Sequence, residues 1–144
     1  KNEFEAELAV FLGGYTAEQV VFGELTTGAS NDLKVASDLA RRMVTQYGMS
    51  SLGPINVMPR PMFGIWRGME EGTELSPKLH DAVDSEIKKI MDSSFKNAQV
   101  ILKQHKAKLD AVAKALLEKE TLESDEFEKI VGKKIKLSVI KTLY

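Results

Sequence analysis

A turn rich in glycine, threonine and serine, at residues 23–30, leads directly into a strongly helical segment in this chain. From Asn31 to Tyr47 the apolar side chains recur at helical spacing on one side, namely Leu33, Ala36, Leu39, Ala40, Met43, Val44 and Tyr47. This period predicts an amphipathic helix that must bury its apolar side against other elements. Gly48 is the predicted C-terminal cap.

The segment before that turn also has a helical pattern, from Asn2 to about Phe22. Asn2 is the predicted cap, and Glu5 stands three residues later as in a capping box. Gly13-Gly14 interrupts the apolar stripe, and because glycine weakens a helix we expect close packing or a bend there.

The second half of the chain predicts three more helices. The first begins at Ser76-Pro77, with serine as cap and proline in the first position, and runs to about Lys106. Its apolar stripe comprises Leu79, Val83, Ile87, Ile90, Phe95, Ala98 and either Ile101 or Leu102. Two shorter helices are predicted, one over about residues 108–118 and one from Ser124 that ends at Gly132.

Residues 49–75 predict a long connection, because they contain four glycines and three of the four prolines. Its short apolar runs suggest a small hairpin, and a loop of this length is usually functional or mobile. We therefore expect a mainly α-helical, bundle-like fold with a long Gly/Pro-containing loop or small hairpin. The 144 residues are long enough for one domain over residues 1–144, with 133–144 as a tail.

Composition excludes several classes of function. The 20 basic and 21 acidic side chains give a net charge of −1, so nothing points to nucleic acid as a partner. The chain has no cysteine, which removes disulfides and thiolate metal sites and fits a reducing compartment. No apolar run is long enough to span a bilayer, so direct membrane insertion is not expected. No Walker-type phosphate loop is present, so we expect no ATP binding here.

Asp32 is the candidate metal ligand. A catalytic zinc site generally has three protein ligands and one open position for water, and a carboxylate in the first turn of a helix is held rigidly enough to be one such ligand. On chemistry alone, however, an aspartate at this place most often caps the helix or satisfies its dipole. His80 and His105 lie far apart on charged helix positions, and we interpret them as solvated rather than as ligands.

Several motifs together resemble the FtsH-type ATP-dependent zinc proteases. They are Leu8-Ala-Val-Phe-Leu-Gly-Gly, Ala17-Glu18, Phe22-Gly-Glu, Thr26-Thr-Gly-Ala-Ser-Asn-Asp-Leu33, Ala40-Arg-Arg-Met-Val-Thr45 and Tyr47-Gly-Met-Ser50. The similarity fades over residues 55–75 and returns at Leu75-Ser76, at Asp84-x-Glu86-Ile87 and at Leu116-Leu-Glu-Lys-Glu-Thr-Leu122. It covers about residues 1–131, and the Thr-Thr-Gly-Ala-Ser-Asn-Asp string is specific.

The resemblance implies that Asp32 is the third zinc ligand and that Glu18, Thr27 and Asn31 lie near the site, with no catalytic residue in this segment. Glu18 is equally well an ordinary glutamate on a helix face. By resemblance, the whole protein is a membrane-anchored homo-hexamer that unfolds protein substrates with ATP, bound by a separate module. Its peptidase domain faces the cytoplasm or an organelle matrix or stroma and cleaves the substrates with zinc.

The family's His-Glu-x-x-His helix, which supplies the other two ligands and the general base, is absent from residues 1–144. We therefore expect the chain to be the C-terminal part of the peptidase domain and to be inactive alone. Tyr15 and Gln19 stand where relatives often carry an arginine and an acid, and residues 58–72 are unusual. The alternative is a non-catalytic pseudoprotease whose helices serve oligomerisation, with the stripe from Leu79 to Leu102 at subunit contacts. An unrelated helical adaptor is a third hypothesis.

Overall fold

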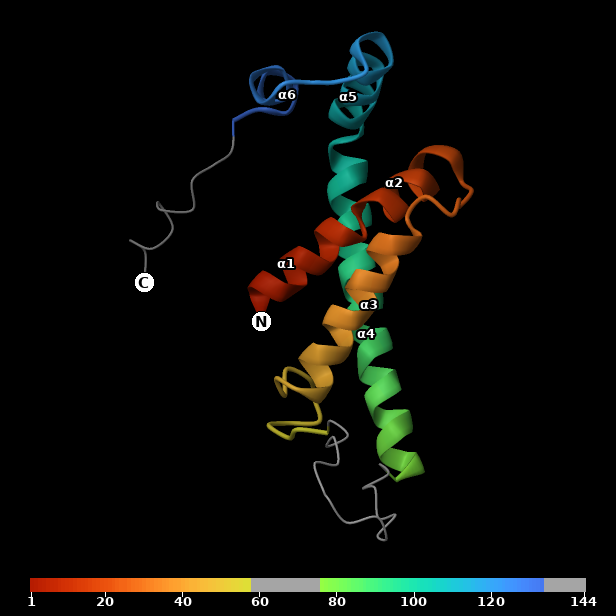
Figure 1. The fold of residues 1–144 in the computed structure, drawn as a ribbon, viewed down its shortest axis with the longest axis vertical. Helices are drawn as coiled ribbons and strands as arrows, with labels where there is room; N and C mark the ends of the chain where they lie inside the picture. The colour runs from red at the N-terminus through yellow and green to blue at the C-terminus, as the bar shows by residue number, and fades with distance from the viewer. Residues whose placement is uncertain (58–75, 134–144) are drawn as a thin grey trace, which may run out of the picture. The chain divides into compact units, whose positions relative to one another are not determined.

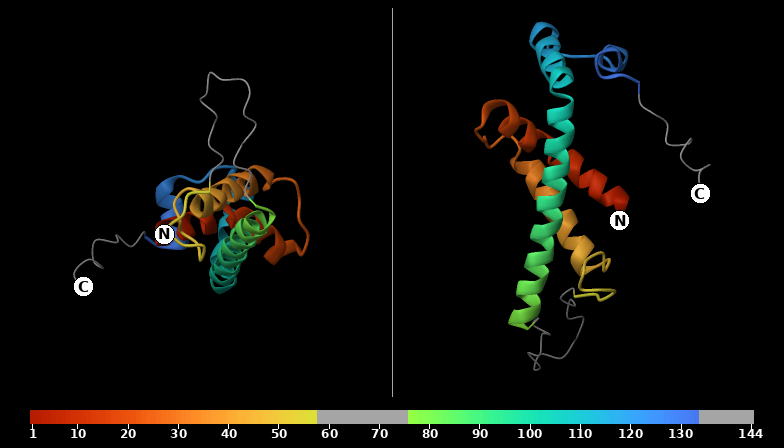
Figure 2. Two further views of the ribbon diagram at one scale, coloured as in Figure 1. Left: turned by 90° about the horizontal axis from the view of Figure 1, so that it is seen from below. Right: turned by 180° about the vertical axis from the view of Figure 1, so that it is seen from behind.

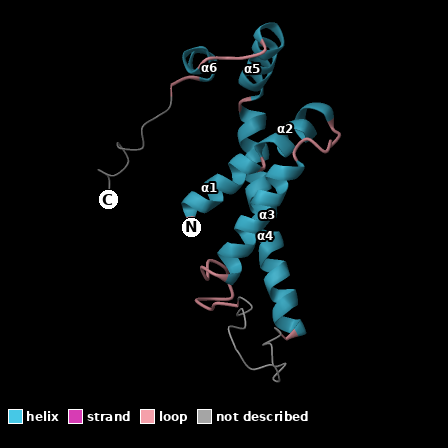
Figure 3. Ribbon diagram, in the orientation of Figure 1, coloured by secondary structure: helices cyan, strands magenta, loops and turns pink. Residues whose placement is uncertain are grey.

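The computed structural model describes residues 1–57 and 76–133, and this part of the chain is built from helices (Figure 1). In chain order they are α1 (Asn2–Phe11), α2 (Gly13–Phe22), α3 (Ser30–Thr45), α4 (Pro77–Gln104), α5 (Lys106–Lys119) and α6 (Ser124–Val131). Loops join them, and neither described range contains a strand (Figure 3). The prediction of a mainly α-helical fold is confirmed. The unusual loop at 58–72, most of the expected hairpin and nearly all of the tail lie outside the described residues.

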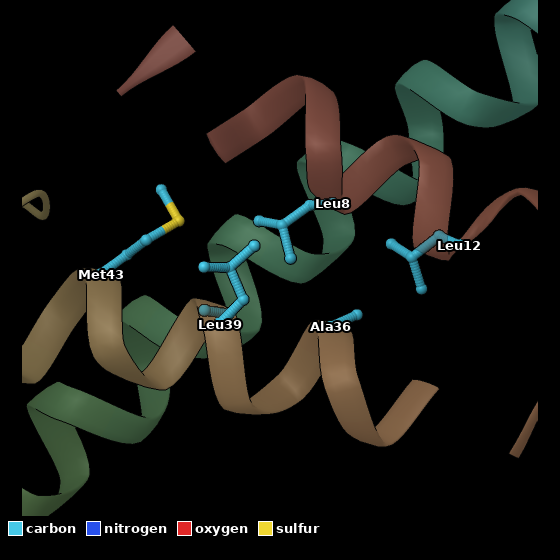
Figure 4. Close-up of a cluster of buried hydrophobic side chains, with 6 residues drawn as sticks. Leu8, Leu12, Ala36, Leu39 and Met43 are labelled. Atoms are coloured by element: carbon cyan, nitrogen blue, oxygen red, sulfur yellow. The ribbon is translucent and has the colours of Figure 1, made fainter. Parts of the chain in front are cut away.

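The chain divides into two compact units, residues 1–101 and the residues from 102 onward. The core of the first unit lies where α1 meets α3 (Figure 4). Leu8 of α1 and Leu12, the residue between α1 and α2, point toward the buried face of α3, which presents Ala36, Leu39, Ala40 and Met43. Beside α3 lies α4 (Figure 2). Four of its apolar side chains pack against the same cluster, namely Ile87, Ile90, Met91 and Phe95.

The predicted stripe on α4 therefore packs largely within the chain. Val83 and Ala98 are almost fully buried, while Val100 and Ile101 beyond them are about half exposed. This helix also begins as predicted, because Pro77 is its first residue and the Ser76 hydroxyl accepts a hydrogen bond from the Leu79 N–H at 3.4 Å.

The prediction of one helix from Asn2 to Phe22 is wrong in one respect, because α1 and α2 are separate at Leu12 (φ −77°, ψ −4°). The break directly precedes Gly13-Gly14, where the sequence predicted close packing or a bend. A side chain at either glycine would meet no atom within 4 Å, so the break and not close packing fits the prediction. The predicted capping box is also wrong. Because α1 already begins at Asn2, Lys1 takes the cap position, and it forms an ion pair with Glu5 at 3.7 Å instead.

The cap position after α3 is Gln46 rather than the predicted Gly48, and Gly48 is the left-handed glycine that turns the chain two residues later. The helix ends at Thr45, two residues before the predicted end, and Gly48 has φ +59°. A β-carbon at Gly48 would lie 3.0 Å from the α-carbon of Pro54, so only glycine fits both the conformation and the space. The chain then folds back, and the Val57 N–H donates to the Thr45 carbonyl at 2.9 Å.

Glu86 on α4 holds this returning segment in place. Its carboxylate, which is 9% exposed, accepts hydrogen bonds from the Ser51 N–H at 2.9 Å and from the Lys89 ammonium at 2.7 Å. The Lys89 hydrogen bond, followed by those from Ser51, lowers the pKa of Glu86 from 4.5 to about 2. A buried carboxylate thus ties α4 to the segment that follows α3.

Replacing Glu86 by glutamine is expected to cost about 2 kcal/mol of unfolding free energy at pH 7, because hydrogen bonds to a charged, buried group are lost. Since the pKa is lower in the folded state than the unfolded value of 4.5, the contribution of the carboxylate is complete above pH 4.5. It is lost as the pH falls through about 2. Urea unfolding of wild type and Glu86→Gln at pH 7 and pH 3 should show the difference shrinking. Asp84→Asn, at an exposed position of the same helix, is the control. A difference in unfolding free energy between wild type and Glu86→Gln that does not change with pH would contradict the role given to the Glu86 carboxylate.

The second unit contains α5 and α6. An ion pair joins Lys119 to Glu126, and the Lys108 ammonium donates to the Val131 carbonyl at 2.6 Å. The α6 helix begins at Ser124, as predicted, but its cap is Glu123, which forms a capping box with Glu126. Gly132 ends α6, also as predicted.

Candidate functional site

Asp32 lies in the first turn of α3, as the sequence predicted, and its side chain is exposed. The helix begins at Ser30, after the buried Ala29, and its first backbone bond runs from the Leu33 N–H to the Ala29 carbonyl at 3.0 Å. Within the described residues no donor contacts the Asp32 carboxylate. Both of its oxygens are therefore accessible to a ligand or to another part of a larger protein.

The turn before α3 is held by Glu18, which the sequence placed near the site. Both oxygens of the half-buried Glu18 carboxylate accept hydrogen bonds from Thr26 at 2.9 Å, one from its N–H and one from its hydroxyl. The Thr26 hydroxyl oxygen in turn accepts the Gly28 N–H at 3.1 Å. These bonds connect α2 to the residues that open α3.

The other residues predicted near the site form simpler contacts. The carbonyl of Thr27 accepts the Ser30 N–H at 3.1 Å, which shapes the last step of the turn. Asn31 is exposed beside Asp32. The Thr26 hydroxyl donates to Glu18 and makes no hydrogen bond with Asp32.

The two positions that depart from the family pattern both contact α4. The ring of Tyr15 packs edge-on against Phe95, with centroids 5.7 Å apart, and the Gln19 side-chain oxygen accepts a hydrogen bond from Gln99 at 3.1 Å. Tyr15 and Gln19 are four residues apart on α2, and their partners are four residues apart on α4, so the two contacts lie in register along the two helices. Sequence reasoning placed Phe95 on the apolar stripe but predicted neither contact, because nothing in the local pattern links residues 80 positions apart.

The described residues do not form a metal site by themselves. They contain no group of three or more side chains able to hold a metal ion, and His80 and His105 are both exposed. Asp32 fits the requirement for a single zinc ligand, because a carboxylate on the first turn of a rigid helix presents unpaired oxygens in a defined direction.

The helical fold and the sequence motifs agree with the peptidase class that the comparisons with known proteins show. The chain is a member of peptidase family M41, whose family model matches residues 1–130. It is similar to the ATP-dependent zinc metalloproteases FtsH 1 of Sphaerobacter thermophilus (44% identity over 130 residues) and of Thermomicrobium roseum (42% over 130 residues), in both cases over 89% of this chain and 20% of the relative. FtsH of Thermotoga maritima is 39% identical over 136 residues, which are 92% of this chain and 22% of that protein. The chain thus spans about one fifth of the length of the curated relatives it matches.

Proposed function

We propose that this chain is the C-terminal part of a zinc-dependent peptidase domain and that Asp32 supplies one of the three protein ligands of the metal. The observation that carries the proposal is the position of Asp32, exposed in the first turn of α3 directly after the family's Thr-Thr-Gly-Ala-Ser-Asn string. Membership of family M41 over residues 1–130 supports it. The other two ligands and the general base come from outside residues 1–144, since the chain contains no His-Glu-x-x-His motif.

The whole protein, in this proposal, hydrolyses peptide bonds of protein substrates. Bound zinc supplies an activated water and polarises the peptide carbonyl. The part played by the chain described here is to hold Asp32 on a helix whose opposite face is anchored in a core, so that the carboxylate keeps its direction. Residues 1–144 by themselves are expected not to hydrolyse peptides.

The assembly and location of the whole protein follow the same proposal. The relatives are named as ATP-dependent, and we infer that a separate ATPase module unfolds substrates and that the subunits form a homo-hexamer. We also propose that the protein is membrane-anchored, with this domain facing the cytoplasm or an organelle matrix or stroma. Within the described residues, no helix combines the length and apolar character that crossing a membrane requires.

The zinc content of the whole protein tests the proposal. Asp32→Asn should lower the zinc-to-protein ratio from near one toward zero after dialysis, because the neutral amide is a much poorer zinc ligand than a carboxylate. Asp38→Asn, at an exposed position of the same helix, should leave the ratio unchanged. Elemental analysis measures both. An Asp32→Asn protein that retains its zinc would overturn the ligand assignment, and a wild-type protein without zinc or proteolysis would favour the pseudoprotease.

A further inference from the structure

Both oxygens of the Glu18 carboxylate accept hydrogen bonds from the same residue of the turn. Its two oxygens accept the N–H and the hydroxyl of Thr26, each at 2.9 Å, across eight residues of chain. Hydrogen bonds to an ionised carboxylate are stronger than neutral ones, and two of them to one residue fix orientation as well as distance. A solvated glutamate on a helix surface, with no structural role, would make no such pair of hydrogen bonds.

The constraint passes from Thr26 to the start of α3. The Thr26 hydroxyl oxygen accepts the Gly28 N–H, so the same hydroxyl is bound on both sides. At Gly28 a β-carbon would lie 3.2 Å from that hydroxyl oxygen and 3.3 Å from the Glu18 carboxylate, so the backbone approaches the pair closely. Ala29, the next residue, is buried and provides the carbonyl that receives the first helical hydrogen bond.

We propose that Glu18 is a positioning residue, which sets the place of Asp32 by fixing the turn from Thr26 to Gly28. This inference rests on the proposed function of Asp32 as a zinc ligand. Glu18 is assigned no ligand role in this proposal; its two hydrogen bonds direct the carboxylate toward Thr26. It acts on the metal through Thr26, in the way that residues behind a ligand control ligand orientation and metal affinity.

A double-mutant cycle in the whole protein tests this route. Glu18→Gln and Thr26→Val should each weaken zinc affinity about 10-fold to 100-fold, measured by competition with a chromophoric chelator. The zinc affinity of the double variant should be no lower than that of the single variant with the lower affinity, because both substitutions break the same contact. Glu24→Gln makes the same chemical change as Glu18→Gln at an exposed residue of the loop that contains Thr26, so it is the matched control and should bind zinc as wild type does.

The outcomes separate this proposal from the assignment of Asp32. Excess zinc should restore proteolysis in Glu18→Gln and Thr26→Val but not in Asp32→Asn, since only the last lacks a ligand. Unchanged zinc affinity in Glu18→Gln would overturn the positioning role, and so would losses that multiply in the double variant. Normal zinc binding by Asp32→Asn would instead overturn the proposed function. Thermal unfolding of each variant establishes that it is folded. If Glu18→Gln does not fold, Thr26→Val provides the test.

Discussion

Replacing Asp32 by asparagine in the whole protein is expected to reduce hydrolysis of an unfolded protein substrate by about 100-fold or more. The substitution keeps the size of the side chain but removes the negative charge that makes a carboxylate a good zinc ligand. Because Asp32 is exposed and receives no hydrogen bond from the described residues, the fold of α3 should be unaffected. ATP hydrolysis, which belongs to a separate module in this account, should continue at the wild-type rate.

Asp38→Asn is the control for this experiment, since it makes the same chemical change at an exposed position of the same helix. It should leave both proteolysis and ATP hydrolysis unchanged. Parallel loss of both activities in Asp32→Asn would indicate a general defect of assembly rather than loss of a metal ligand. Undiminished proteolysis would show that Asp32 has no part in the reaction.

Truncating Leu8 to alanine is expected to destabilise the chain by about 3 kcal/mol. Leu8 is fully buried between α1 and α3, where it contacts the cluster that contains Leu39 and Met43 (Figure 4). The substitution removes apolar contacts and leaves a cavity that surrounding helices fill only in part. Because small domains are stable by only about 5–15 kcal/mol, this loss is a large share of the total.

Urea unfolding followed by circular dichroism measures this effect. Val10→Ala on the same helix is the matched control, because Val10 is 76% exposed and its truncation should change stability by less than about 0.5 kcal/mol. Equal, small effects of the two substitutions would contradict the placement of Leu8 in the core.

The helical fold was predictable because its signals are local and repeated. The periodic apolar positions of α3 and α4 identified the buried faces, with Ala36, Leu39 and Met43 among the residues that form the core. Exact boundaries were less predictable, because capping depends on single side chains that have alternatives. Asn2 was expected to cap α1 but lies inside it, and Gly48 was expected to cap α3, where Gln46 takes that position.

The position of Asp32 in the first turn of α3 was also predictable, since the turn-to-helix sequence defines it. What holds that turn was not. The hydrogen bonds from Thr26 to Glu18 depend on how the loop after α2 folds back. The hydrogen bond from Ser51 to Glu86 joins residues 35 positions apart. Such contacts leave no periodic trace in the sequence, and they appear only once the helices are packed.

The most direct measurement is anomalous diffraction at the zinc absorption edge from crystals of the whole protein. This account predicts an anomalous peak about 2.0–2.2 Å from an Asp32 carboxylate oxygen. It also predicts that both Glu18 oxygens remain bonded to Thr26. A zinc ion held by three other side chains, with Asp32 beyond bonding distance, would contradict the central claim that Asp32 is a zinc ligand.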